Sequence, residues 1–391
     1  MSTTAVADGP MARLAAEHPI IVCCGSGGVG KTTTAAVLAL AGARQGRNAV
    51  VVTIDPAKRL ANALGLDALS DTAHEIDRGL WDPDGIAPPG GRLSALMLDT
   101  KSTFDHLVLK YSLDPAQGER ILQNRFYRNI SGALAGTQEY MAMEKLHELH
   151  DEGGYDLIVI DTPPTRNALD FLDAPARLTR LLNNRLFRLL MAPTRASMRV
   201  ANFALQAFFR SVSRVVGKEV VEDLVLFFQA FEGMEEGFRV RATRVMQLLS
   251  DRRTAFVLVT APARDAVSEA RYFHDRLQDA GLRVNGLVVN RIHPEFGDTN
   301  GRPPPGSSDG RQGEGVGRIG ELYANLADFI ELSKREQRHL DGLERSVGPV
   351  PIVRVPLLEV EVCDIASLTE VGRYLLGPAS PAASEGPRSA G

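Results

Sequence analysis

Short runs of apolar residues, rich in Val and Ile, alternate with longer segments of helical spacing along this chain of 391 residues. Such runs are typical of strands that are buried on both faces, and the helical segments between them are typical of crossover connections. The pattern therefore predicts an α/β fold in which helices flank a mostly parallel sheet. The predicted strands cover residues 20–25, 48–55, 94–99, 155–161, 255–260, 283–290 and 351–356.

Two of the connecting segments are much longer than a crossover requires, and both have a helical pattern. They cover about residues 102–150 and 170–250. Segments of this length and periodicity predict an α-helical subdomain that is inserted into the sheet domain and lies at one end of the sheet.

Three segments have the composition of irregular chain. Residues 1–18 are rich in Ala, Ser and Thr, whereas residues 299–318 and the tail at 377–391 are rich in Gly, Pro and Ser. We expect disorder at the two ends and a flexible loop at 299–318. The remaining chain, residues 19–376, is then one domain that carries the helical insertions.

Composition and charge narrow the class of protein. Hydrophobic residues make up 44% of the chain and charged residues 24%, which suffices for a large core, and a formal net charge of -4 disfavours a nucleic-acid-binding protein. No run of about 18 uncharged apolar residues predicts a membrane-spanning helix, and the N-terminus lacks the pattern of a secretory signal. The three cysteines, Cys23, Cys24 and Cys363, cannot form a disulfide framework. These features predict a cytoplasmic protein.

The strongest chemical signal is the sequence GSGGVGKT at Gly25–Thr32, which fits the pattern G-x-x-x-x-G-K-[ST] between a predicted strand and a predicted helix at 31–44. Glycines let backbone N–H groups surround phosphate oxygens, and the helix N-terminus adds partial positive charge. The motif predicts a P-loop that binds ATP, with Lys31 at the β- and γ-phosphates and Thr32 on Mg²⁺. The expected nucleotide contacts are Gly25, Gly27, Gly28, Val29, Gly30, Lys31, Thr32 and Thr33.

Two aspartates end predicted strands at the same edge of the sheet as this loop. Asp161 follows an apolar run, where a Walker-B carboxylate lies, and we expect it to hold Mg²⁺ together with Thr32; alternatively, it only caps the next turn. Asp55 would position the water that attacks the γ-phosphate, although on its own it is equally a turn residue before Pro56. Lys31, Asp55 and Asp161 are therefore the expected catalytic residues.

Three segments, GGVGKTTTA, DPAKRLANAL and DTPPTRNALDFL, resemble the deviant-Walker ATPases of the arsenite-pump (ArsA) and tail-anchored-protein-targeting family. The resemblance extends over nearly the whole ordered chain, and the pattern looks closest to actinobacterial ArsA-like paralogues. It implies an α/β ATPase domain with a helical cap that works as a nucleotide-gated dimer. By position, it implies that Asp55 and Asp161 are the aspartates of switch I and switch II, that Asn290 contacts adenine, and that Pro356 and Leu357 flank the base.

The chain departs from the family pattern in the P-loop. The family's signature lysine, the second residue of G-K-G-G-x-G-K, is Ser26 in this sequence. In relatives that lysine reaches the nucleotide of the partner subunit, which a serine cannot do. The chain then either forms a heterodimer with a paralogue that retains the lysine or hydrolyses ATP slowly as a homodimer. Alternatively, Arg166 supplies the missing charge, unless it is only a surface arginine.

The metal sites of the family are also missing from the sequence. No CxxC pair is present to bridge a dimer through zinc, and the three cysteines do not match a metalloid site. Arsenite transport is therefore disfavoured, and Cys23 and Cys24 are expected in the core. His147 and His150 are expected to be exposed residues of a helix.

The second long insertion contains a basic amphipathic segment. Residues 174–218 carry nine basic residues and no acidic residue, interleaved with Leu, Phe and Met. Such a segment is typical of a surface that binds an anionic membrane or a hydrophobic client. It is equally consistent with ordinary packing of the cap behind a solvated arginine face.

The sequence thus predicts a cytoplasmic, Mg²⁺-dependent ATPase whose nucleotide state is coupled to a helical cap that binds a client or the membrane surface. Two alternatives are an ATPase subunit that energises an anion transporter and a regulatory subunit that binds ATP without hydrolysing it. In each case the expected ligands are ATP and Mg²⁺, and no nucleic acid is expected.

Overall fold

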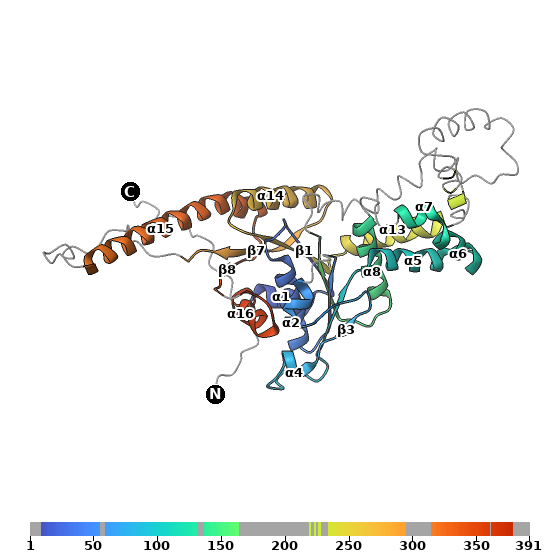
Figure 1. Ribbon diagram of the computed structural model, residues 1–391, viewed down its shortest axis with the longest axis horizontal. Coiled ribbons are helices and arrows are strands. Elements are labelled where there is room, and N and C mark those ends of the chain that lie inside the picture. The colour runs from blue at the N-terminus through green and yellow to red at the C-terminus, as the bar shows by residue number, and fades with distance from the viewer. Residues whose placement is uncertain are drawn as a thin grey trace, which may run out of the picture.

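A single sheet organises the molecule. The computed structural model describes residues 9–54, 59–130, 137–163, 234–294, 314–359 and 361–377, together with residues 219, 223, 226 and 227. In this part of the chain the strands have the order β3-β4-β2-β5-β1-β6-β7-β8 (Figure 1). The strands are β1 (Ile20–Cys24), β2 (Asn48–Thr53), β3 (His74–Glu75), β4 (Arg92–Met97), β5 (Leu157–Asp161), β6 (Thr254–Thr260), β7 (Val284–Ile292) and β8 (Ile352–Pro356).

Every pairing in this sheet is parallel except that between β3 and β4. The predicted α/β fold with a mostly parallel sheet is therefore confirmed. Strand β3 was not predicted, because its two residues are exposed and form no apolar run. It pairs antiparallel with β4 at the edge of the sheet.

Helices cover both faces of the sheet and form an apolar core on each face. Alternate residues of a strand point into the two cores. In β5, Leu157 and Val159 face one core, whereas Ile158 and Ile160 face the other. The first core is built with α1 (Pro10–Glu17), α2 (Lys31–Arg44), α3 (Arg59–Ala63), α4 (Arg78–Trp81) and α16 (Ile365–Leu375). The second is built with α5 (Thr100–Tyr111), α6 (Pro115–Gln123), α7 (Arg125–Ile130), α8 (Thr137–Asp151), α13 (Glu235–Ser250), α14 (Arg264–Asp279) and α15 (Glu314–Val347).

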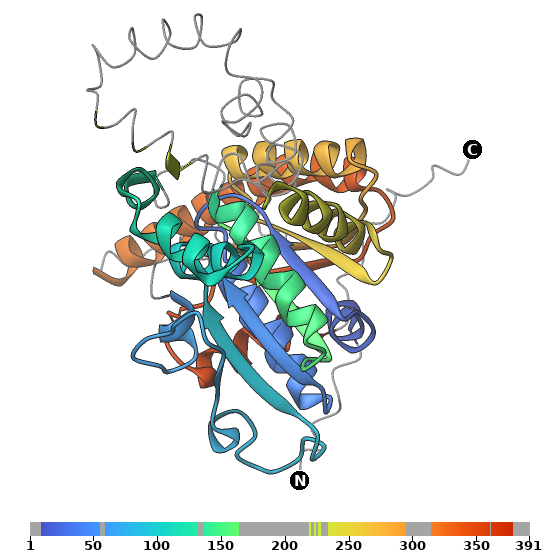
Figure 2. The same cartoon turned by 90° about the vertical axis from the view of Figure 1, so that its right-hand side faces the viewer.

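Helices α5 to α8 and α13 form a helical cap at one end of the sheet (Figures 1 and 2). The first predicted insertion, about 102–150, contains α5 to α8, whereas most of the second, about 170–250, lies outside the described residues. The cap shares one apolar core with the sheet, because Leu107 and Met143 belong to the same buried cluster as Ile160. None of the described helices is both long and apolar enough to cross a membrane.

A buried ion pair connects two helices of the cap. Nε of Arg241 in α13 lies 2.6 Å from Oε2 of Glu144 in α8, and both side chains are buried. His147 of α8 is buried beside this pair, so the expectation that it is exposed is wrong. The reason is that α13 packs over this side of α8. Burial, together with the charge of Arg241, lowers the pKa of His147.

The N-terminal segment differs from the expected disorder, because residues 10–17 form helix α1. Pro10 lies in its first turn, where proline is favoured, and Met11 and Ala15 are buried in the first core. The backbone N–H of Gly9 donates to the carbonyl oxygen of Leu376 at 3.1 Å, which links α1 to the end of α16.

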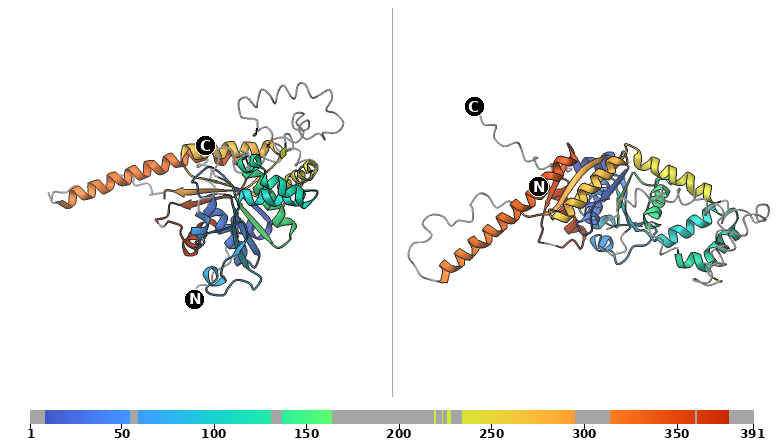
Figure 3. Two further views of the ribbon diagram at one scale, coloured as in Figure 1. Left: turned by 45° about the vertical axis from the view of Figure 1, so that its right-hand side comes forward. Right: turned by 90° about the horizontal axis from the view of Figure 1, so that it is seen from above.

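Helix α15 begins at Glu314, so residues 314–318 are helical and do not belong to the flexible loop predicted at 299–318. The helix extends this far because no proline interrupts residues 314–347. Residues 299–313 and 378–391 lie outside the described residues. One end of α15 packs beside α14 and β7, and the other extends away from the sheet (Figure 3).

Candidate nucleotide site

The loop between β1 and α2 has the backbone that its glycines predict. Gly30 is the N-cap of α2 and has a φ of 99°, which L side chains rarely adopt. A Cβ atom at this position would also overlap Nδ2 of Asn290. The first turn of α2 contains no acidic residue. The loop and the helix N-terminus therefore present backbone N–H groups and partial positive charge to an anion.

Lys31 begins α2 and is 5% exposed. Its Nζ donates to the carbonyl oxygen of Ser26 at 2.8 Å, so the ammonium group is held against the loop. Ser26 is buried as well, and its Oγ makes no hydrogen bond with any residue that the structure describes. The side chain at the position of the signature lysine is thus short and enclosed.

Asp161 ends β5 and is fully buried. Its Oδ2 accepts hydrogen bonds from Oγ1 of Thr32 at 2.6 Å and from Oγ1 of Thr53 at 2.9 Å. Residues from α2, β2 and β5 therefore converge on one carboxylate. A threonine hydroxyl and a carboxylate are the hard oxygen donors that Mg²⁺ prefers, so this pair fits the expected metal. Across the described ranges, no group of three or more His, Cys, Asp or Glu side chains is arranged to hold a metal ion by itself.

Three sequence-predicted features lie outside the described residues: Asp55, Arg166 and the basic segment 174–218. The chain that leads to Asp55 nevertheless reaches this site. The backbone N–H of Ile54 donates to the carbonyl oxygen of Asp161 at 3.3 Å. Strand β2 therefore ends directly beside Asp161.

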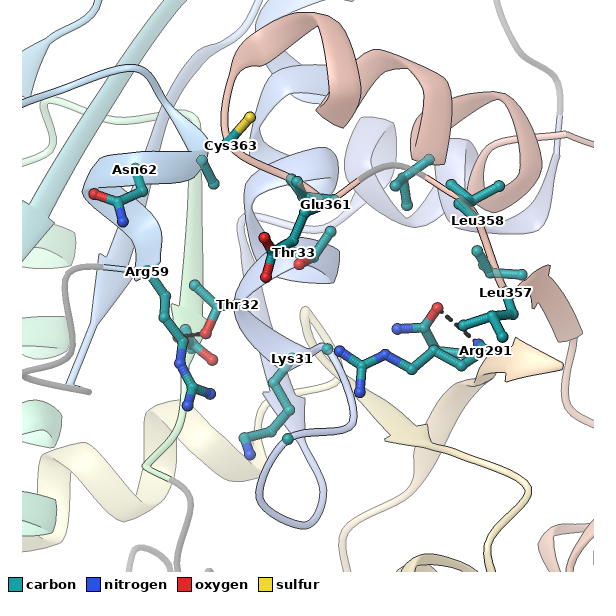
Figure 4. Close-up of a pocket in the computed structure, with 18 of the residues that line it drawn as sticks. Lys31, Thr32, Thr33, Arg59, Asn62, Arg291, Leu357, Leu358, Glu361 and Cys363 are labelled. Atoms are coloured by element: carbon teal, nitrogen blue, oxygen red, sulfur yellow. Dashed lines mark hydrogen bonds between the residues drawn. The ribbon is translucent and has the colours of Figure 1, made fainter.

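The residues expected at the base lie on the other side of the loop. Nδ2 of Asn290, near the end of β7, donates to the carbonyl oxygen of Val29 at 2.9 Å. Pro356 ends β8, and Leu357 follows it with an exposed side chain. These three residues and the P-loop line one cavity of about 810 Å³ (Figure 4).

This cavity brings together most of the predicted site residues. Gly25, Gly27 and Val29 belong to the same loop but do not line the cavity. The predicted residues that line it are Gly28, Gly30, Lys31, Thr32, Thr33, Asp161, Asn290, Pro356 and Leu357.

The cavity is also lined by residues that were not predicted, among them five with polar or charged side chains or a thiol. Arg59 and Asn62 come from α3, Arg291 follows Asn290, and Glu361 and Cys363 lie between β8 and α16. Figure 4 shows Arg59 and Thr32 among the side chains that line this cavity. The segment DPAKRLANAL, which carries part of the family resemblance, contains Arg59 and Asn62 and so held a signal for them.

The three thiols differ in environment. Cys23 and Cys24 are buried in β1, as expected, whereas Cys363 is exposed at the cavity. Burial raises the pKa of Cys24 to about 12, and burial with the charge of Asp161 raises the pKa of Cys23 well above its usual value. Thiolates are the reactive form, so Cys23 and Cys24 are inert in the folded chain.

We therefore expect iodoacetamide at pH 8 to alkylate Cys363 while the other two thiols stay unmodified. Saturating ADP is expected to slow this reaction several-fold, because a nucleotide in the cavity would cover the thiol. Peptide mass spectrometry after timed quenching measures all three sites. Modification of Cys23 or Cys24 at the rate of Cys363 would contradict the described packing of β1.

Together, the parallel sheet, the glycine loop between the central strand and its helix, and a carboxylate at the end of the neighbouring strand are the construction of a P-loop nucleoside triphosphatase. The fold and the site thus define the class of the protein. The sequence model of the anion-transporting ATPase family, ArsA_ATPase, matches residues 18–327 of this chain. The chain belongs to this family and is an ATPase.

Individual relatives agree with this assignment. The ATPase GET3 of Malassezia globosa is 24% identical over 372 residues, which cover 92% of either chain. The protein SCO2128 of Streptomyces coelicolor is 29% identical over 272 residues, covering 69% of this chain and 62% of its own. A protein of Aquifex aeolicus named as an arsenical pump-driving ATPase is 20% identical over 377 residues, covering 93% of this chain and 80% of its own. The resemblance to the ArsA family is thereby confirmed.

Proposed function

We propose that the chain binds ATP with Mg²⁺ in the cavity at the P-loop and hydrolyses it, and that the nucleotide state controls the helical cap. The observation that carries this proposal is the 2.6 Å contact between Oγ1 of Thr32 and Oδ2 of Asp161. It joins the helix that follows the P-loop to the carboxylate beside it, inside a cavity large enough for a nucleotide.

In this proposal each residue acts on the nucleotide through its position. The P-loop amides and Lys31 bind the β- and γ-phosphates, and Thr32 and Asp161 would hold Mg²⁺, which neutralises charge on the transferred phosphoryl group. Asn290 contacts adenine, with Pro356 and Leu357 beside the base. Asp55 positions the attacking water.

The Asp161→Asn variant tests this assignment. We expect ATP turnover to fall on the order of 10²-fold, because a neutral amide cannot replace the carboxylate that is directed at the metal position. Measuring turnover across a range of Mg²⁺ concentrations separates the effect on the metal from that on the nucleotide. Asp156→Asn is the matched control, because Asp156 lies just before the other end of β5 and binds the backbone N–H of Asn48.

The control variant is expected to keep the turnover and Mg²⁺ dependence of the wild type. If Asp161→Asn behaves in the same way, Asp161 does not hold the metal. If the wild-type chain binds no adenine nucleotide in calorimetry, the proposed function itself is wrong.

The proposal extends to the cap as a binding surface for a hydrophobic client or an anionic membrane. Its support among the described residues is three exposed leucines, Leu109 in α5, Leu113 between α5 and α6, and Leu226, which are 46%, 75% and 57% exposed. Exposed apolar side chains on the cap would favour contact with an apolar partner. Because the cap and the sheet share a core, a change at the nucleotide would be transmitted to this surface.

We also propose that the chain acts as a dimer in the cytoplasm, with a second copy or with a paralogue that retains the signature lysine. The enclosed side chain of Ser26 supports the paralogue as partner, because it leaves no long cation on the loop at that position. The family description favours a second candidate, an ATPase subunit that energises an anion transporter. A regulatory subunit that binds ATP but has no turnover on its own is the third, and the turnover of the purified chain decides between the third candidate and the other two.

A further inference from the structure

The pairing of β7 with β8 is irregular at the end of β7. In the ladder between β7 and β8, Asn290 pairs with Val355, but the next pair is Ile292 with Pro356. Arg291 is therefore an extra residue that has no partner in this ladder. It is a β-bulge, a device that redirects a side chain.

The bulge changes the face to which Arg291 belongs. Along a regular strand, Val289 and Arg291 would share one face of the sheet, and Asn290 would lie on the other. In the structure, Val289 and Ile292 both pack in the core on the cap side. Asn290 and Arg291, although neighbours in sequence, both line the nucleotide cavity.

The backbone of Arg291 is strained to achieve this. Its φ of 62° is the one positive value for a residue other than glycine in the described chain. This conformation costs roughly 1 kcal/mol for an L side chain. Its backbone N–H donates to Oδ1 of Asn290 at 3.0 Å, which stabilises the turn. A strained residue at the wall of a binding cavity points to a function for its side chain.

The side chain extends from the end of β7 toward the P-loop at the start of α2 (Figure 4). Among the described residues, no carboxylate forms an ion pair with its guanidinium group. The cavity therefore holds an exposed cation between the residues expected at the base and Lys31. A guanidinium group matches the geometry of phosphate oxygens and binds them through two parallel hydrogen bonds.

We propose that Arg291 binds the phosphates of the nucleotide and that the bulge at the end of β7 exists to aim it there. The inference rests on the proposed function, since it assumes that the cavity takes an adenine nucleotide. It adds a second phosphate-binding cation, from the strand that also carries Asn290. Asn290 would then contact the base, and its neighbour Arg291 would contact the phosphates.

Arg291→Gly and Arg291→Asn test this role without a backbone penalty, because glycine and asparagine tolerate positive φ. We expect each variant to bind ADP on the order of tenfold more weakly, as loss of a charge-assisted hydrogen bond predicts. Arg291→Lys, which keeps the charge but not the fork, is expected to lose less affinity. Isothermal titration calorimetry with ADP measures these constants, and competition by adenosine reports on the base site alone.

Controls separate a phosphate contact from other roles. Arg252→Gly removes the same charge from an exposed turn between α13 and β6, and it is expected to leave ADP affinity unchanged. The melting temperature without nucleotide is expected to stay equal or to rise in Arg291→Gly, because glycine relieves the strain.

Each outcome bears on the proposal. A loss of ADP affinity with unchanged adenosine affinity supports it. It is overturned if ADP binds within twofold of the wild type, or if adenosine is weakened as much as ADP, which would place Arg291 at the base. A wild-type chain that binds no ADP would defeat the proposed function first, and this inference with it.

Discussion

Replacing Lys31 with methionine is expected to lower ATP turnover by about 10³-fold. The ammonium group is almost fully enclosed and is held by the carbonyl oxygen of Ser26, 2.8 Å from Nζ, at the N-terminus of α2. A cation that is fixed before the phosphates arrive stabilises the charge that develops during transfer, and loss of one such group costs about 10²- to 10³-fold. Methionine keeps the length of the side chain without the charge. Steady-state release of phosphate at saturating ATP measures the effect.

Lys110→Met provides the matched control, because Lys110 is an exposed residue of α5 outside the cavity. It is expected to keep wild-type turnover. Circular dichroism should show that both variants remain folded. Residual turnover above one tenth of the wild type in Lys31→Met would show that the enclosed ammonium group is not the main phosphate contact.

The Arg241→Met variant is expected to lose about 3 to 5 kcal/mol of unfolding free energy. Glu144 is 1% exposed, and its Oε2 lies 2.6 Å from Nε of Arg241. Removing the arginine would take this counter-charge away from the buried carboxylate, and breaking a buried pair in this way is strongly destabilising. Urea titration followed by circular dichroism at 222 nm measures the change, because the pair holds α8 against α13.

The double variant Arg241→Met with Glu144→Met separates two contributions to the free energy of unfolding: the cost of burying one charge alone and the net contribution of the ion pair. Replacing both members with apolar residues of similar size is often nearly neutral, so the double variant is expected to recover most of the stability. A single variant within 1 kcal/mol of the wild type would mean that water or another cation reaches Glu144.

The sheet and the phosphate cradle were largely predictable from sequence, because their signals are local. A strand that is buried on both faces must be a continuous apolar run, and β1, β2, β5 and β6 all have this pattern. The glycine loop needs its glycines at fixed positions. The contact between Thr32 and Asp161 followed from topology, since neighbouring parallel strands end at the same edge.

The remaining features depend on long-range packing that no local pattern contains. Glu144, the partner of Arg241, lies 97 positions away in sequence, so no local sequence pattern predicts that the two form a buried ion pair. The bulge at Arg291 depends on how β7 meets β8, and the sequence around Asn290 is compatible with a regular strand. Helix α1 was not predicted although Pro10 marks its start, because an Ala-rich composition is also typical of irregular chain.

The hydrogen bond between Gly9 and Leu376 has a practical consequence for experiments on the cap. It places the start of α1 next to the end of α16, on the face of the sheet opposite α8 and α13. A tether attached next to Gly9 or next to Leu376 would therefore hold the molecule on that face. Immobilised in this way, the chain would leave the exposed leucines of the cap free to meet vesicles or peptides.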